Sequence, residues 1–165
     1  MITTAKGSSW AIGQKIADEK LISTKTDSIS SAERRNYGTA TGNIEKHNIG
    51  GAIFGIDLDI THPIAYGYQD RVVPVYKNNR VWIAPSKNDY STVGKYLNEP
   101  HIDGYISPEN LKIMKRSASI VVSRKGKGRI ILFADNPNFR GSWYGTNKLF
   151  LNAIFFGDNI NVPTN

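Results

Sequence analysis

Cysteine is absent from the 165-residue chain. This excludes disulfides, thiolate metal sites and a cysteine nucleophile, but it does not decide the compartment. Apolar runs of the ~20 residues needed to span a bilayer are also missing, since the longest cover only 130–133 and 153–156. The N-terminus lacks the basic and then apolar segments of a signal peptide. We therefore expect either a cytoplasmic protein or a piece of a longer exported chain.

Charge is unevenly balanced, with a net charge of +7, while 39% of residues are hydrophobic and 21% charged. These proportions are typical of a globular protein, and the length fits a single domain over 1–165. A basic chain attracts anionic partners. The local cluster at 124–129 could hold phosphate, or it could be a solvated turn between two strands. Without neighbouring aromatic residues for base stacking, it predicts no nucleic-acid partner.

Local patterns predict a mixture of strands and helices. Alternation and β-branched runs predict strands at 1–5, 52–60, 71–76, 81–84, 118–123 and 129–134, of which 71–76 and 81–84 form a hairpin. Helices are predicted at 10–21, 31–37, 90–97, 107–116 and 143–156, the first capped by Ser8 or Ser9 and the fourth by Ser107. This mixture predicts a three-layer α/β or α+β sandwich with the strands near Val121 and Ile131 at its centre.

The chain opens inside a strand–turn–helix unit. We expect the fold to be incomplete at this end, so that an unprotected sheet edge favours a homodimer.

Gly7-Ser8-Ser9-Trp10-Ala11 resembles the G-x-S-x-G nucleophile elbow, with alanine in the last place. It lies between a predicted strand and a predicted helix, where an elbow belongs. Ser8 or Ser9 is therefore a candidate catalytic nucleophile of a serine hydrolase. The required late histidine is missing, since the last one is His101. A serine that caps the helix would explain the same letters.

Metal chemistry has little support in the sequence. The residues three positions after the three histidines are Gly50, Ala65 and Gly104, so the His-x-x-Glu spacing of zinc peptidases does not occur. Asp57 and Asp59 share one face of a predicted strand. They could bind a hard cation or act in acid–base chemistry, or they could be the polar face of a half-exposed strand.

Unusual polar and aromatic residues gather in 133–144, directly after a predicted buried strand. Ligands of open α/β sheets tend to bind beyond the carboxyl ends of strands. The alternative is a rigid loop in which Asp135 pairs with Arg140 and Trp143 packs inward. The candidate ligand-binding residues, to which His62 is added from the 62–68 loop, are Asp135, Asn136, Asn138, Arg140, Trp143, Tyr144 and His62.

The run 128–153 (GRIILFADNPNFRGSWYGTNKLFLNA) closely resembles the C-terminal end of large zinc carboxypeptidases of the carboxypeptidase A superfamily from Bacteroidetes-type bacteria. The stretches 56–68 and 105–119 are similar to the same region, so the resemblance covers most of the chain. No residue of the zinc motif is matched.

This resemblance implies a class I glutamine amidotransferase-like domain, which is a flavodoxin-type α/β sandwich. It implies a secreted or periplasmic parent whose zinc lies in a separate, N-terminal peptidase domain, the expected partner of this chain. No cofactor or membrane contact is expected for the chain itself. The amidotransferase-like fold places a cysteine nucleophile at a strand–helix elbow, which corresponds here to residues 5–9 and contains no cysteine. The resemblance thus predicts a non-catalytic accessory domain.

Overall fold

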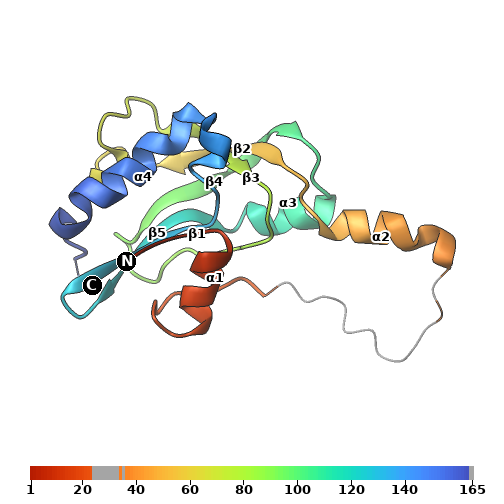
Figure 1. Ribbon diagram of the computed structural model, residues 1–165, viewed down its shortest axis with the longest axis horizontal. Helices are drawn as coiled ribbons and strands as arrows, with labels where there is room; N and C mark the ends of the chain where they lie inside the picture. Colours follow the sequence, from red (N-terminus) through yellow and green to blue (C-terminus); the bar gives the residue numbers. More distant parts are fainter. Residues whose placement is uncertain (24–33, 35, 164–165) are drawn as a thin grey trace.

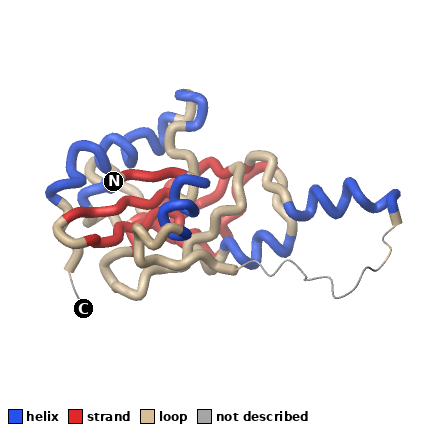
Figure 2. The backbone as a smooth tube through the Cα atoms, turned by 60° about the horizontal axis from the view of Figure 1, so that its bottom comes forward, coloured by secondary structure: helices blue, strands red, loops and turns tan. Residues whose placement is uncertain are grey.

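The computed structural model describes residues 1–23, 34 and 36–163. Its described strands form one curled six-stranded sheet in the order β1-β6-β5-β4-β2-β3 (Figures 1 and 2). Only β1 and β6 are parallel, and every other neighbouring pair is antiparallel. The strands are β1 (Ile2–Thr4), β2 (Ala52–Leu58), β3 (Val72–Lys77), β4 (Thr92–Gly104), β5 (Ala118–Lys125) and β6 (Gly128–Phe133).

Helices cover both faces of the sheet, so the protein is a mixed α/β structure. In Figure 1, α4 lies on one face and α1 on the other. The helices are α1 (Lys6–Gly13), α2 (Ala40–His47), α3 (Pro108–Met114) and α4 (Tyr144–Phe156), with short 3-10 turns η1 (Tyr37–Thr39), η2 (Pro63–Ala65), η3 (Phe139–Gly141) and η4 (Gly157–Asn159).

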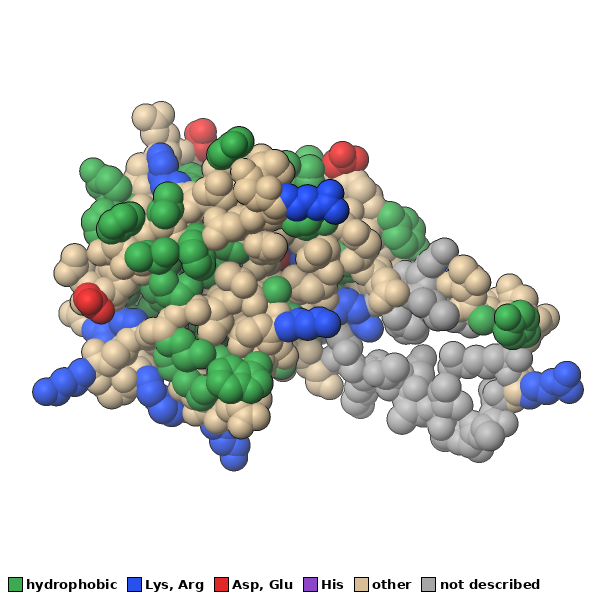
Figure 3. All heavy atoms as spheres, in the orientation of Figure 1, with side chains coloured by type: hydrophobic (Ala, Val, Ile, Leu, Met, Phe, Trp, Pro, Cys, Tyr) green, Lys and Arg blue, Asp and Glu red, His purple; other side chains and the backbone are tan. Residues whose placement is uncertain are grey.

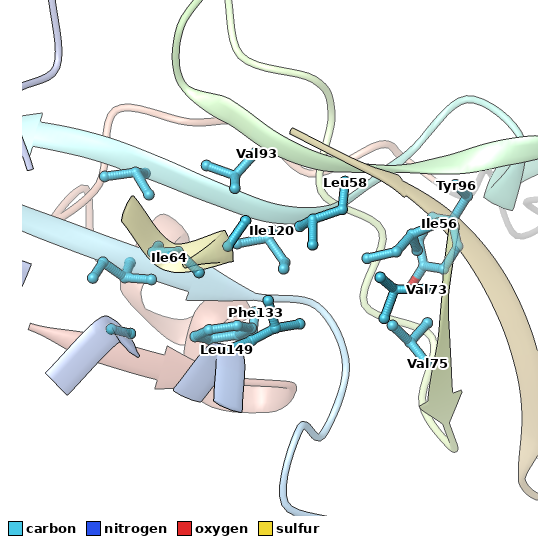
Figure 4. Packing of buried hydrophobic residues seen from close by; sticks show 14 of the residues in the cluster. Ile56, Leu58, Ile64, Val73, Val75, Val93, Tyr96, Ile120, Phe133 and Leu149 are labelled. Atoms are coloured by element: carbon cyan, nitrogen blue, oxygen red, sulfur yellow. The ribbon is translucent and has the colours of Figure 1, made fainter. Parts of the chain in front are cut away.

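The alternation of side chains along β5 and β6 divides the core into two clusters. Ile120 and Phe133 point to the face of α4, where they meet Leu149 and, from η2, Ile64 (Figure 4). Leu132 belongs to the second cluster, on the α1 side, together with Ala11 and Val121. Both faces of these strands are therefore buried, as the apolar runs near Val121 and Ile131 predicted.

Several predicted elements are confirmed. The strands at 1–5, 52–60, 71–76, 118–123 and 129–134 form, as does the helix at 143–156. Ser107 caps α3 as predicted, because its hydroxyl accepts a hydrogen bond from the N–H of Asn110. Pro108 occupies the first turn of that helix, where no backbone donor is lost.

Other predictions were wrong. Most of the segment 90–97 lies in the long strand β4, because its backbone pairs with β2 and β5. The segment 81–84 makes only isolated bridges at Ile83, to Leu21 and Ala118, and forms no hairpin with β3. Helix α1 begins at Lys6 and ends at Gly13, and its N-cap is Ala5 instead of a serine. The helix expected at 31–37 lies largely outside the described residues.

Candidate functional site

A buried polar network lies beneath the carboxyl ends of β6 and β1. Lys77, the last residue of β3, is fully buried, and the three N–H groups of its ammonium have four oxygens within hydrogen-bonding distance. These are Val81 O at 3.0 Å, Ala134 O at 3.1 Å, Asp135 Oδ1 at 3.1 Å and Asn79 Oδ1 at 3.3 Å. Its Nζ also lies 5.0 Å from the centre of the Trp82 ring. Such a set of acceptors holds a lysine cation inside a protein core.

Asp135 is the counter-charge of this lysine. Besides the ion pair, its Oδ2 accepts a hydrogen bond of 2.5 Å from Ser119 Oγ, and its Oδ1 accepts one from the Tyr96 hydroxyl. Burial lowers the pKa of Lys77, and Asp135 partly opposes this shift. Burial, reinforced by the Asp135 charge, raises the pKa of Tyr96 well above its ordinary value. The carboxylate of Asp135 is thus enclosed by protein donors.

Asp135 therefore pairs with Lys77. The alternative prediction, an ion pair between Asp135 and Arg140, is wrong. Arg140 is exposed, adopts a positive φ of 52° and lies over the ring of Phe139. The ring of Phe139 stacks on Tyr76, with centroids 3.6 Å apart. Aromatic packing on β3, rather than an ion pair, thus fixes this part of the loop.

The other candidate residues of this segment are spread along it. Asn136 Oδ1 accepts a hydrogen bond from the N–H of Asn138, which closes a turn. Trp143 is half-buried and donates from Nε1 to Pro74 O at 3.3 Å. Tyr144 is 78% exposed at the start of α4. The structure thus brings Asp135 into the core and leaves Asn138, Arg140 and Tyr144 on the surface.

His62 lies in the loop before η2. Its Nδ1 accepts a hydrogen bond from the N–H of Ile64, which caps η2, and burial lowers its pKa although Asp59 opposes the shift. The loop is fastened to α4, because Asn152 donates to Ile64 O and Tyr66 O at 2.7 and 2.9 Å. The structure therefore gives His62 a local capping role next to α4.

The strand-to-helix turn at Ala5 has the geometry of an elbow. Ala5 adopts φ 46° and ψ −119°, a conformation that strains a residue with a side chain. Its N–H donates to Phe133 O, which ties the turn to the neighbouring parallel strand β6. Sharp, strained turns of this type present the nucleophile of hydrolases. Here the residue at that position carries only a methyl group.

The two candidate serines lie further along α1. Ser8 is fully buried, its hydroxyl donates to Phe133 O at 2.8 Å, and it lies 2.9 Å from Thr3 Oγ1. Ser9 follows in the same helical turn and is half-buried. Neither stands at the strained position. The hydroxyl of Ser8 instead joins α1 to β1 and β6.

A cleft of about 560 Å³ opens beside the elbow. Lys6, the first residue of α1, forms one wall, the loop after β3 forms another, and the residues before β2 form a third. Asn79 connects the cleft with the buried network, since its Oδ1 accepts from Lys77 and from the N–H of Val81 at 2.9 Å. The complete lining is Lys6, Asn48, Ile49, Gly50, Asn78, Asn79, Arg80 and Val81.

Metal-binding geometry is missing from the described part of the chain, where no three His, Asp or Glu side chains gather. Asp57 forms a bidentate ion pair with Arg71, with both contacts at 2.8 Å. Asp59 accepts from the N–H and hydroxyl of Thr61 and closes a turn. The two carboxylates therefore have separate partners.

Within the described residues, no helix is long and apolar enough to cross a membrane.

Lys77 was overlooked in the sequence, although a signal was present. Val73, Val75 and Lys77 alternate along β3 and all point inward. A lysine in phase with buried valines requires a buried carboxylate, and Asp135 is the acid that follows the most apolar strand.

Comparison of the chain with family models, with curated proteins and with solved structures finds no match. The similarity to zinc carboxypeptidases therefore stays a prediction from the sequence.

Proposed function

We propose that this chain is a non-catalytic accessory domain of an exported zinc carboxypeptidase, built as part of a class I glutamine amidotransferase-like α/β sandwich. The observation that carries the proposal is the strained elbow at Ala5. Strain of this kind is maintained where a fold presents a reactive group. A methyl group at the presenting position leaves the elbow without a nucleophile.

The arrangement around the elbow supports the amidotransferase-like assignment. The run 128–153, which carries the resemblance, corresponds to β6, the loop after it and most of α4. Strand β6 pairs in parallel with the elbow strand β1, and helices lie on both faces. The remaining strand pairs are antiparallel, which differs from the parallel sheet of a flavodoxin-type sandwich.

An exposed apolar surface supports a role in contact with another domain. Leu151, Ile154 and Phe155 of α4 are between 49% and 73% exposed, and Tyr66 of the neighbouring loop is 69% exposed. Figure 3 shows hydrophobic side chains gathered over this helix. Contiguous apolar surface is typical of interfaces. The peptidase domain of the same parent, which would carry the zinc, is the partner we propose, and a second copy of the chain is the alternative.

Serine-directed labelling tests the absence of catalysis. A fluorophosphonate reacts with activated serine nucleophiles, and we expect no labelling of the folded protein. The alternative is a stand-alone serine hydrolase that uses Ser8 or Ser9 as its nucleophile. Ser8 is fully buried. Labelling that disappears in Ser8→Ala or Ser9→Ala, with the fold intact, would contradict the proposal and establish the hydrolase.

A further inference from the structure

We propose that the cleft beside the elbow binds a small oxyanion, such as a carboxylate or a phosphate group. This site goes beyond the accessory role and does not depend on it. The cleft volume of about 560 Å³ lies within the range of small-molecule sites.

The charge of the cleft favours an anion. Lys6 and Arg80 both line it, and no acidic residue is among the described residues that do. Within the described part of the chain, neither of these two cations forms an ion pair. The first N–H groups of a helix also lack intrahelical partners, and Lys6 is the first residue of α1.

Two residues that line the cleft carry buried donors without a protein acceptor. Nε of Arg80 and Nδ2 of Asn79 are buried, and neither has a hydrogen-bond partner in the described structure. The orientation of the Asn79 amide is fixed, because its oxygen already accepts from Lys77 and from the N–H of Val81. Its NH₂ must therefore face away from these donors. Buried donors without acceptors are rare in folded proteins.

An oxyanion supplies what these groups lack. Its oxygens accept hydrogen bonds from the guanidinium and from the amide, and its charge balances the two cations. Three asparagines in the lining, Asn48, Asn78 and Asn79, add polar groups that could contact the uncharged part of such a ligand. An apolar ligand would leave these donors unpaired.

The test is a titration of the full chain with acetate and, separately, with inorganic phosphate, followed by amide NMR shifts. We expect saturable shifts centred on residues 6 and 79–81, which weaken as sodium chloride is added. Tighter binding of acetate assigns the ligand to carboxylic acids, and tighter binding of phosphate assigns it to phosphate esters. Shifts that do not saturate, or that spread over all basic residues, would overturn the site.

Charge-matched variants sharpen the test. Arg80→Gln should weaken binding about tenfold, as expected for the loss of one charge-assisted contact. Lys127→Gln removes the same charge from the exposed turn between β5 and β6, and it should leave affinity unchanged. Lys6→Gln, at an exposed position, should weaken binding without affecting the fold. Equal weakening by Lys127→Gln, or none by Lys6→Gln and Arg80→Gln, would contradict the proposal.

Discussion

Replacing Asp135 by asparagine would leave the buried ammonium of Lys77 without its counter-charge. The side chains of Lys77 and Asp135 are 0% and 5% exposed, so water cannot take over the solvation of either. Asparagine keeps the shape. With its oxygen in the place of Oδ1 it still accepts from Tyr96, and its NH₂ in the place of Oδ2 can donate to Ser119 Oγ instead of accepting from it. The variant therefore removes the charge and reverses one hydrogen bond. Breaking a buried pair by removing one partner costs about 3–5 kcal/mol.

The assay is urea unfolding, supported by thermal unfolding. At about 2–4 °C per kcal/mol for a domain of this size, we expect Asp135→Asn to lower the melting temperature by about 6–20 °C. Lys77→Met should cost a similar amount. The double variant should be less destabilised than the sum of the two, because it buries no unpaired charge.

The exposed pair Lys115–Glu99 provides the matched control. Its contact of 2.8 Å is shorter than the buried one, yet Glu99 is 88% exposed. Lys115→Met should therefore change stability by less than about 1 kcal/mol. If Asp135→Asn and Lys115→Met had equally small effects, the reasoning that burial makes the Lys77 pair critical would be refuted.

Three further predictions concern the backbone and pH. Ala5→Gly should raise the free energy of unfolding by about 1 kcal/mol, since relief of strain exceeds the entropic cost of glycine; a lower urea midpoint would contradict the strained elbow. Gly104→Ala should destabilise the protein by about 1–3 kcal/mol, because φ is +87° and a Cβ would lie 2.8 Å from Ala52 Cα. The control Gly13→Ala should not destabilise it, because a Cβ there meets nothing within 4 Å. Equal effects of the two variants in urea unfolding would refute this. His62→Asn should keep the η2 cap and remove a pH dependence, measured from urea midpoints on either side of pH 6.5. Because the folded pKa of His62 is lowered, the unfolded chain binds more protons between that pKa and 6.5. The stability contributed by the neutral imidazole is therefore complete above pH 6.5 and is lost as the pH falls from 6.5 through the folded pKa. An unchanged pH dependence in the variant would contradict this.

The sequence predicted elements whose signals are local. Ser107-Pro108 marks a helix start by its own chemistry, and the β-branched runs of β5 and β6 are long enough to identify buried strands. The segment 90–97 failed because Gly94 and the irregular pairing of β4 conceal its alternation, which only the neighbouring strands β2 and β5 enforce.

The candidate site was predictable only in part. Asp135 stood out by its place after a buried strand, but its partner Lys77 is 58 residues away in sequence. Nothing in the segment 133–144 shows whether Asp135 pairs with Arg140 or with Lys77. The folded sheet, and not the local sequence, brings Asp135 and Lys77 together. The resemblance placed an elbow within residues 5–9, but it did not identify Ala5 as the strained position, since alanine carries no chemical signal and the strain belongs to the backbone.

The size of the native gene product tests the central claim most directly. An antibody raised against this domain should detect, in an immunoblot of the source organism, a band far larger than 18.3 kDa. Tryptic peptides from that band should include the His-x-x-Glu motif of a zinc carboxypeptidase. A band at 18.3 kDa would contradict the accessory role and show a free-standing protein.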